Sequence, residues 1–471
     1  MSPFPHPKPL PSSYWLKSIK GRIPTISALP SAADIVVIGT GISGASTVFH
    51  LAERFQSLPK PTPLRILLLD ARDISGGATG RNGGLMWPGL LDSWPALAGK
   101  YGRSTAAHLI RFDLDNCHAT AKTALALNKA CTAGDPADPC LYFYPKGGVN
   151  LLYTEDEVRS WKENIAAMQA EGCPEWGVTM WSEQQTRQLV PNVCGVIGAV
   201  HNKYVWRMRS GRLVASLLNQ AKRIAADSNG LLQLDVSTYT RVDRVEAMQS
   251  TPASKYALNV MTEKGNVSAG KVVYCTNAYS SALLPTVDIT PVKNQVVVTN
   301  ELKVLPWDCA IKAHSGYDYL SSREDNRVVL GGMRYLAPGF EVGNSNDGVL
   351  DPVVSNALKT FMSTECPEVK SGDSDGTVKV QEEWAGIMGF TSDHMPLVGP
   401  IPNRKNELIC AGFSGHGIAR AFLCGKAVAD MTLGVDATNA SNVVDLPAVF
   451  LPRGRFDKPK DADPSKLVSK M

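Results

Sequence analysis

The chain has 471 residues, of which 44% are hydrophobic and 20% charged, and its formal net charge is +4. These values are typical of a globular protein, and the length favours two closely joined domains over one simple core. No dense run of Lys and Arg marks a nucleic-acid surface, and no apolar run approaches the roughly 18 residues of a membrane-spanning helix. The sequence therefore predicts no nucleic-acid partner and no membrane partner, and it carries no signal for an oligomeric state.

The cysteines and the chain ends bear on location. Ten cysteines are scattered without CxxC or metal-ligand spacing, which predicts reduced thiols, an intracellular protein and no metal site. The N-terminal residues are Pro-rich and polar, without the apolar segment of a secretory signal. The final residues Ser469-Lys470-Met471 resemble a Ser-Lys-Leu peroxisomal address. Cytoplasmic and peroxisomal locations both stay open, with a solvated Lys-rich tail as the alternative reading.

The first 70 residues predict the start of a parallel sheet. Residues 1–33 are rich in proline and are expected to form an extended arm. The β-branched run 33–39 predicts a buried strand, residues 44 to about 56 a helix, and residues 65–70 a second buried strand. Continuous apolar strands that flank a helix indicate a parallel sheet.

Three glycines join the first strand to the helix. Gly39, Gly41 and Gly44 follow the pattern GxGxxG in the required context. The first permits a tight turn, the second lets the backbone approach a pyrophosphate, and the third lets helix and strand pack closely. The helix N-terminus offers N–H groups to phosphates, and Asp70, at the end of the next strand, is placed to bind a ribose hydroxyl. A dinucleotide, NAD or FAD, is therefore expected, with a ligand-free glycine turn as the alternative.

A second glycine-rich loop, DARDISGGATGRNGG at residues 70–84, favours FAD. A nicotinamide enzyme has little use for it, whereas the longer FAD needs a chain that reaches its pyrophosphate and its ring. Arg81 offers a charge-assisted contact, and Gly83 and Gly84 let backbone N–H groups come close. The alternative is a surface loop with a solvated arginine.

The rest of the chain predicts interleaved domains. Helical periodicity recurs at 104–131, 155–172 and 211–226, a further helix is expected to open at Gly417, and the other stretches alternate as strands. The predicted fold is α/β (α+β mixed): a Rossmann-type FAD-binding domain interleaved with a substrate domain on a mixed or antiparallel sheet. The expected division is an N-terminal arm at 1–33, an FAD-binding domain at 34–100, 211–285 and 375–440, a substrate domain at 101–210 and 286–374, and a C-terminal tail at 441–471.

Several segments carry a family resemblance. The loop GATGRNGG (77–84), the block EEWAGIMGFTSDHMPLVGPIP (382–402) and the segment LICAGFSGHGIARAFLCGKAVADMTLG (408–434) resemble the D-amino-acid-oxidase-like superfamily of flavoproteins, which contains sarcosine and glycine oxidases. The loop is most similar to the branch with γ-glutamylputrescine oxidoreductase and fungal FAD-dependent oxidoreductases. Further matches lie at 238–246, 272–285, 289–299 and 317–332, so the resemblance covers residues 33–434.

The resemblance implies where FAD is held. Val242 is expected to meet the adenine, the turn at Thr276 to close the FAD domain, and the helix after Gly415-His416-Gly417 to stabilise the reduced ring. His416 is expected to position groups rather than act as a general base. The residues expected to bind FAD are Gly39, Gly41, Ile42, Ser43, Gly44, Asp70, Ala71, Arg72, Thr79, Gly80, Arg81, Asn82, Gly83, Gly84, Val242, Thr276, Asn277, Ala278, Gly386, Gly415, His416, Gly417 and Ile418.

Two departures from the family pattern carry information. Covalent members attach the flavin to a cysteine where this chain has Gly386-Ile387-Met388, and the nearest following cysteine is Cys410. Noncovalent FAD is therefore expected. Sarcosine-oxidase-like members carry a lysine shortly after the GHG turn, where this chain has Ile418-Ala419. The source of positive charge near the ring stays open, beyond the helix dipole.

The expected reaction is hydride transfer from the α C–H of an amine, amino acid or N-substituted amino acid to flavin N5, followed by hydrolysis of the imine. O2 is expected to accept the electrons, giving hydrogen peroxide. The alternatives are a dehydrogenase that uses another carrier, a biosynthetic flavin dehydrogenase acting on a nitrogen-containing intermediate, and a flavin-bound protein without catalysis.

Candidate substrate-side residues are mostly aromatic, since aromatic faces suit an amine or ammonium group, although each such residue taken alone is more often part of a core. Lys293 stands where relatives carry Arg, and a cation there raises oxygen reactivity or binds a substrate carboxylate, unless it is an exposed strand lysine. The catalytic candidates are Lys293 and His416. The pocket candidates are Trp87, Trp206, Tyr317, Tyr319, Trp384 and Met388.

Overall fold

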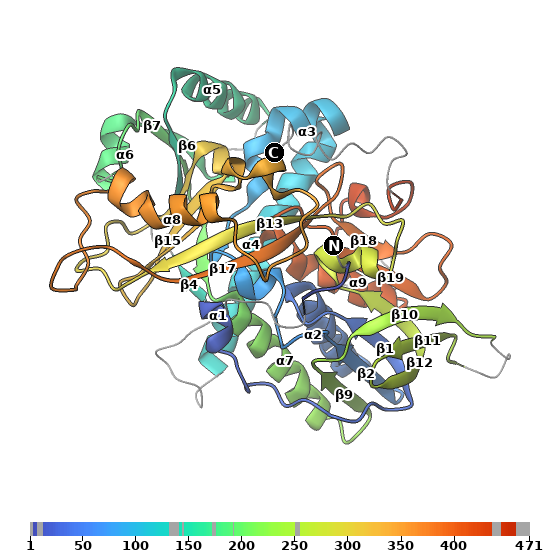
Figure 1. The fold of residues 1–471 in the computed structure, drawn as a ribbon. Helices are drawn as coiled ribbons and strands as arrows, with labels where there is room; N and C mark the ends of the chain where they lie inside the picture. The colour runs from blue at the N-terminus through green and yellow to red at the C-terminus, as the bar shows by residue number, and fades with distance from the viewer. Residues whose placement is uncertain are drawn as a thin grey trace.

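Two large β-sheets organise the chain (Figure 1). The computed structural model describes residues 3–6, 13–130, 141–143, 146–171, 176–191, 193–249, 255–435 and 444–457. The tail residues Ser469-Lys470-Met471 lie outside the described residues.

The first sheet contains the predicted dinucleotide-binding strands. Its order is β10-β11-β12-β1-β2-β9, and β19 continues it beside β12, with β18 paired to β19. The pairs of β12, β1, β2, β9 and β19 are parallel, so the parallel sheet expected around the first two strands is confirmed. The strands are β1 Ala32–Ile38, β2 Leu64–Leu69, β9 Leu232–Ser237, β10 Val242–Ala247, β11 Leu258–Thr262, β12 Gly265–Tyr274, β18 Leu397–Pro400 and β19 Glu407–Ala411.

Three helices pack together beside this sheet. Helix α2 (Ile42–Ser57) contacts both α7 (Ser210–Ala226) and α9 (Ala421–Leu433), and α7 also contacts β9. Their apolar side chains join one large cluster with alternate residues of the sheet, such as Val37 and Leu68, both fully buried. A strand that is apolar on both faces forms a stable sheet only when both faces are covered, and β1 and β2 meet that condition.

The second sheet is mixed. Its order is β17-β13-β16-β15-β14-β5-β7-β6, and among these pairs β14 and β5 run parallel while the others run antiparallel. The predicted mixed α/β fold is thus confirmed. The strands are β5 Gly148–Leu152, β6 Val178–Ser182, β7 Gly198–Asn202, β13 Thr290–Thr299, β14 Ala310–Ala313, β15 Asp318–Ser322, β16 Val328–Gly332 and β17 Val380–Phe390.

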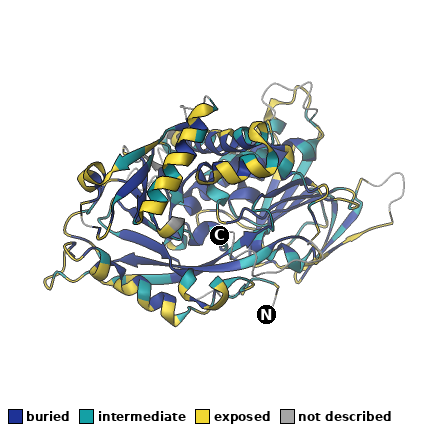
Figure 2. Cartoon of the chain, turned by 90° about the horizontal axis from the view of Figure 1, so that it is seen from above, coloured by how far each residue is buried: buried dark blue, intermediate teal, exposed yellow. Residues whose placement is uncertain are grey.

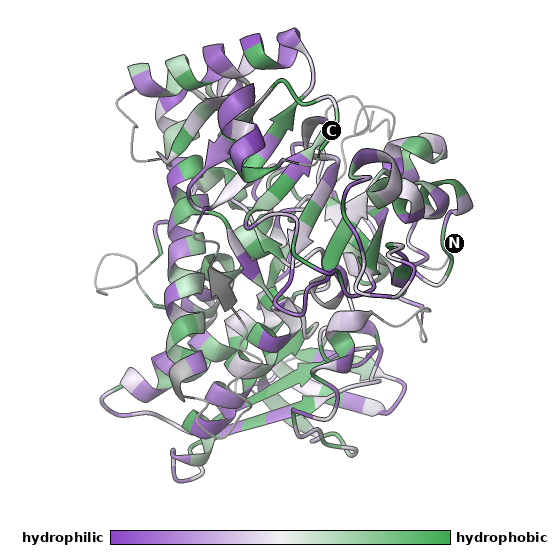
Figure 3. Cartoon of the chain, turned by 90° about the vertical axis from the view of Figure 1, so that its left-hand side faces the viewer, coloured by the Kyte–Doolittle hydropathy of each residue, from purple (hydrophilic) through white to green (hydrophobic). Residues whose placement is uncertain are grey.

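Shorter elements complete the fold. Helix α8 (Pro352–Glu365) packs on β13 and β16, and α4 (Arg103–Ala130) contacts α7 and α9. Most strand residues in the middle of the molecule are buried, whereas the exposed residues gather on the outer sides of the helices and in the loops (Figure 2). The long helices carry both polar and apolar residues along their length (Figure 3). The remaining elements are α1 Tyr14–Lys17, α3 Trp94–Tyr101, α5 Glu155–Ala170, α6 Glu183–Leu189, and a small sheet of β3 Leu85–Met86, β8 Trp206–Met208 and β4 Leu141–Phe143.

The domain division stays a proposal, and one strand argues for redrawing it. β17 falls in the range 375–440 that was expected in the FAD-binding domain. It pairs antiparallel with β13 of the second sheet, from Phe390 opposite Thr290 to Val380 opposite Thr299. Strand β17 therefore belongs structurally with the substrate side.

In the described part of the chain, the seven cysteines are free. No described helix is long and apolar enough to cross a membrane, and no cluster of three His, Cys, Asp or Glu side chains among these residues could hold a metal ion.

Candidate active site

A cavity of about 480 Å³ runs between the two sheets. It starts where β1 and β2 end, passes the 77–83 loop, and reaches the side chains of β13, β15 and β17. Segments far apart in sequence therefore meet around one space.

The three glycines of the first turn have the geometry that their pattern predicts. Gly39 has a φ of +112° and donates its N–H to Leu69 O at 2.7 Å. A Cβ on Gly44 would lie 1.9 Å from the carbonyl oxygen of Gly39, so only glycine permits this approach of helix to strand. Gly41 caps α2 without a side chain, and the Thr79 hydroxyl accepts from Ile42 N at 3.0 Å. Gly39, Gly41 and Ile42 line the cavity, whereas Gly44 acts behind it.

Asp70 lines the cavity and also holds the turn. Its carboxylate accepts from the backbone N–H and hydroxyl of Thr40, at 2.7 and 2.6 Å, and from Arg72 N at 2.9 Å. Burial raises the pKa of Asp70, and these hydrogen bonds oppose that rise. A carboxylate oxygen accepts more than one bond, so the predicted ribose contact remains a prediction compatible with this geometry.

Two arginines of the second glycine loop share one buried carboxylate. Asp347 Oδ2 lies 2.7 Å from Arg72 Nη1 and 3.9 Å from Arg81 Nε, and Arg81 also donates to Ala385 O at 2.9 Å. Desolvation lowers the pKa of Arg81 to about 10. An anionic group in the cavity would compensate for that desolvation, as a pyrophosphate would. Sequence reasoning missed Asp347, because nothing in its loop distinguishes it from other turn residues.

The GHG turn differs in part from expectation. Gly415 has a φ of +82°, residues 417–419 form a 3₁₀ turn, and α9 begins at Ala421 rather than at Gly417. His416 lines the cavity and donates from Nδ1 to Ser414 O at 2.9 Å. Burial, with Arg420 nearby, lowers the pKa of His416 well below 6.5. A neutral His416 suits the predicted positioning role and supplies no positive charge to a flavin ring.

The substrate side holds two cations that sequence reasoning missed. The Arg334 guanidinium lies over the Tyr317 ring at 4.8 Å, and Lys312 Nζ lies over the Trp87 ring at 4.4 Å and 3.2 Å from Asp92. All five line the cavity. The signal for Arg334 was present as an arginine two residues after the Gly331-Gly332 strand end, but only the fold shows where it points.

Lys293 lies off the cavity, against its prediction as a catalytic residue. On β13, Asn294 and Val296 line the cavity, so alternation turns Lys293 to the opposite face. There it is buried, 2.9 Å from Glu341, and donates to Val349 O at 3.1 Å. We therefore do not assign Lys293 a contact with flavin or substrate.

The other predicted site residues fall into those that line the cavity and those that do not. Trp87, Tyr317, Tyr319 and Met388 line the cavity, whereas Trp206 and Trp384 are buried outside it. Two loop glycines, Gly80 and Gly84, also lie outside it. The remaining predicted cofactor residues that line it are Ser43, Ala71, Arg72, Thr79, Arg81, Asn82, Gly83, Val242, Thr276, Asn277, Ala278, Gly386, Gly415, Gly417 and Ile418.

The donor set fits FAD without a covalent link. The site supplies a glycine turn at a helix N-terminus, buried arginines along the second loop, and aromatic walls further on. Gly386, Ile387 and Met388 line it where covalent relatives carry cysteine, and Cys410 is fully buried in β19 outside it.

The comparisons agree with this site. The DAO family, "FAD dependent oxidoreductase", matches residues 34–431, and the chain belongs to this family. FAD as cofactor and the resemblance stated from sequence are thereby confirmed.

Individual relatives are distant but match over nearly their whole length. The γ-glutamylputrescine oxidoreductase of Escherichia coli (strain K12) is 25% identical over 463 residues, which is 94% of each chain. The glycine oxidase structure from Geobacillus kaustophilus has a TM-score of 0.68 at 18% identity and covers 90% of this chain and 98% of its own. The L-proline dehydrogenase structure from P. horikoshii has a TM-score of 0.68 at 20% identity and covers 91% and 100%. These structures show the shared fold.

Proposed function

We propose that the protein oxidises an amino acid or N-substituted amino acid at its α C–H, with noncovalently bound FAD as oxidant and O2 as electron acceptor. The names of the relatives above concern γ-glutamylputrescine, glycine and L-proline, all compounds with a C–H next to nitrogen. When bound, FAD would supply the two-electron oxidant for this C–H bond, and O2 would take up the electrons as hydrogen peroxide. The nitrogen lone pair forms the C=N bond of the imine, the N–H proton leaves to solvent, and water hydrolyses the imine.

Arg334 is the observation that favours an amino acid over a simple amine. Arg334 is 9% exposed and lines the cavity, and its guanidinium lies over the Tyr317 ring at 4.8 Å and 6.0 Å from the centre of the Phe390 ring. Burial lowers its pKa, because the cation loses water. A substrate carboxylate could form charge-assisted, bidentate hydrogen bonds with this guanidinium from within the cavity.

Two uncompensated polar atoms support a substrate with both donor and acceptor groups. Asn294 Oδ1 and Trp87 Nε1 are buried and have no hydrogen-bond partner among the described residues, and both residues line the cavity. An amine N–H would satisfy the first, and a carboxylate or carbonyl oxygen the second. The amide nitrogen of Asn294 lies 3.3 Å from the Tyr319 hydroxyl, which fixes the direction of its oxygen.

Asp318 positions the wall that carries Arg334. Its carboxylate accepts from Met333 N at 2.8 Å and from the Tyr335 hydroxyl at 3.2 Å, on either side of Arg334. It also pairs with His314 Nδ1 at 2.7 Å, and His314 lies three residues before Tyr317 in the chain. One buried side chain thus fixes both turns that face the substrate.

Anaerobic reduction of the flavin tests the proposal. Matched pairs such as sarcosine with dimethylamine, or proline with pyrrolidine, differ only in the carboxylate. The member with the carboxylate is expected to bleach the flavin faster, and Arg334→Gln to lose about ten- to 100-fold in kcat/KM. Arg327→Gln is the control, since Arg327 contacts Thr299 and Gln381 away from the cavity.

Two results would count against this function. Equal reduction by both members of each pair contradicts the carboxylate preference. Reoxidation of the reduced flavin by an electron-accepting dye but not by O2 contradicts the oxidase assignment and favours a dehydrogenase.

A further inference from the structure

Two tryptophan side chains donate hydrogen bonds to consecutive backbone carbonyl groups of the second glycine-rich loop. Trp15 Nε1 donates to Asn82 O at 2.6 Å, and Trp384 Nε1 donates to Arg81 O at 3.0 Å. The two indoles come from opposite ends of the chain, one from α1 and one from β17, and share a small buried cluster with Val298. Neither lines the cavity, so both act from outside it.

The direction of these bonds matters for the cofactor. A trans peptide group directs its C=O and its N–H to opposite sides. Holding the carbonyls of Arg81 and Asn82 toward the indoles therefore turns the N–H groups of Asn82 and Gly83 away from them. Asn82 and Gly83 both line the cavity.

Gly80 and Gly84 of this loop do not line the cavity and instead accommodate the N-terminal arm. A Cβ on Gly84 would lie 2.9 Å from the Trp15 ring, and a Cβ on Gly80 would lie 2.3 Å from Leu16 Cδ2. The Ser13 hydroxyl also donates to Gly80 O at 2.5 Å. These glycines, predicted from sequence to approach FAD, instead let the arm pack against the loop.

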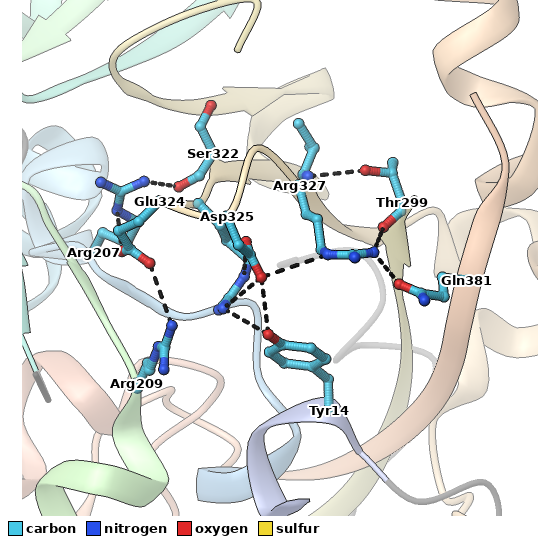
Figure 4. Close-up of polar contacts among 11 residues, drawn as sticks. Tyr14, Arg207, Arg209, Thr299, Ser322, Glu324, Asp325, Arg327 and Gln381 are labelled. Carbon is cyan, nitrogen blue, oxygen red and sulfur yellow. Dashed lines mark hydrogen bonds and ion pairs between the residues drawn. The ribbon is translucent and has the colours of Figure 1, made fainter. Parts of the chain in front are cut away.

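The arm is anchored to the second sheet by the charged turn at residues 323–325, which joins β15 to β16. The Tyr14 hydroxyl donates to Asp325 Oδ2 at 2.9 Å (Figure 4). The Arg323 guanidinium stacks on the Tyr14 and Trp15 rings, at 4.5 and 4.8 Å, and donates to the Tyr14 hydroxyl at 3.0 Å. Lys17 pairs with Glu382 of β17 at 2.9 Å. The arm is therefore anchored both to the turn between β15 and β16 and to β17, and residues of β15 and β17 line the cavity.

We propose that Trp15 and Trp384 are positioning residues for FAD: their indole N–H groups fix the peptide groups of residues 81–83, so that the loop presents its N–H groups to the cofactor. Residue 15 precedes the stretch 34–431 that the family matches. The N-terminal arm thus helps to position the loop that contacts the cofactor. This proposal concerns FAD alone and is independent of the substrate.

Trp15→Phe and Trp384→Phe test it, because each removes the indole N–H and keeps an aromatic ring. FAD titrated into the apoprotein and followed by flavin fluorescence is expected to bind about three- to tenfold more weakly to each variant. The visible absorption bands of the bound flavin are expected to shift, because the loop N–H groups move. The thermal midpoint of each apoprotein is measured beside it.

Trp307→Phe is the matched control. Trp307 is equally buried, in the second sheet's cluster, and its Nε1 has no hydrogen-bond partner among the described residues. It is expected to keep wild-type FAD affinity and flavin bands. Wild-type affinity in Trp15→Phe and Trp384→Phe, or a loss matched by Trp307→Phe, overturns the proposal. Should the tryptophan variants fail to fold, Ser13→Ala gives the same test at the Gly80 carbonyl, with weaker FAD binding expected and unchanged binding overturning the proposal.

Discussion

The buried ion pair between Asp113 and Arg420 offers the sharpest test of how the GHG turn is held. Arg420 Nε lies 2.7 Å from Asp113 Oδ1, Nη2 lies 3.2 Å from Oδ2, and the two side chains are 2% and 1% exposed. Arg420 caps α9 directly after the turn, and Asp113 comes from α4. Asp113→Ala leaves a buried guanidinium without its carboxylate.

The expected cost is about 3–5 kcal/mol, because a buried charge that loses its partner keeps its desolvation penalty. For a chain of this size that corresponds to a fall in Tm on the order of 3–5 °C. Thermal unfolding with excess FAD measures it, with Asp113→Ala, Arg420→Met and the double variant forming a cycle. The exposed pair Asp375–Lys379, at 50% and 57% exposure, is the control, and Asp375→Ala is expected to leave Tm unchanged.

The double variant is expected to be more stable than the sum of the two single losses predicts, since it removes both buried charges. A loss below about 1 kcal/mol for Asp113→Ala, or strict additivity in the cycle, refutes the reasoning.

Two further outcomes are expected. Gly44→Ala forces a Cβ to within 1.9 Å of Gly39 O, so the purified protein should lose FAD on dialysis, and full retention of FAD speaks against the turn as described. The pKa of His416 is lowered by burial, so the unfolded chain takes up a proton near pH 6.5 that the folded chain refuses. The free energy of unfolding therefore carries no penalty from His416 above pH 6.5 and falls as the pH drops below that value. A series of Tm measurements should show a smaller loss at acid pH for His416→Gln than for the wild type. An unchanged dependence of Tm on pH contradicts the buried neutral imidazole.

Sequence predicted the parts of the site that are local. The turn at Gly39, Gly41 and Gly44 needs only a strand, a helix and their close approach, and each is encoded within a few residues. The loop from Asp70 to Gly84 follows directly, so its place beside the cavity was also predictable. Local patterns sufficed because the same short segment supplies both the geometry and the contact.

The residues that sequence missed are brought in by long-range pairing. Arg334 reaches the cavity only because β16 pairs with β13 and Asp318 fixes the turn after it. Lys293 was misplaced because the sequence around it does not say which face of β13 is covered. Trp384 was expected at the substrate and instead supports the loop at Arg81. For Lys293, strand alternation decides the outcome, because its neighbours Asn294 and Val296 line the cavity and Lys293 does not.

The absorption spectrum of the purified protein, before and after acid precipitation, tests the central claim most directly. The account predicts the two visible bands of an oxidised flavin and their complete transfer to the supernatant, since Gly386, Ile387 and Met388 offer no group for a covalent bond. Yellow colour that stays with the pellet contradicts noncovalent binding. A colourless protein that takes up no added FAD contradicts the assignment of the cavity.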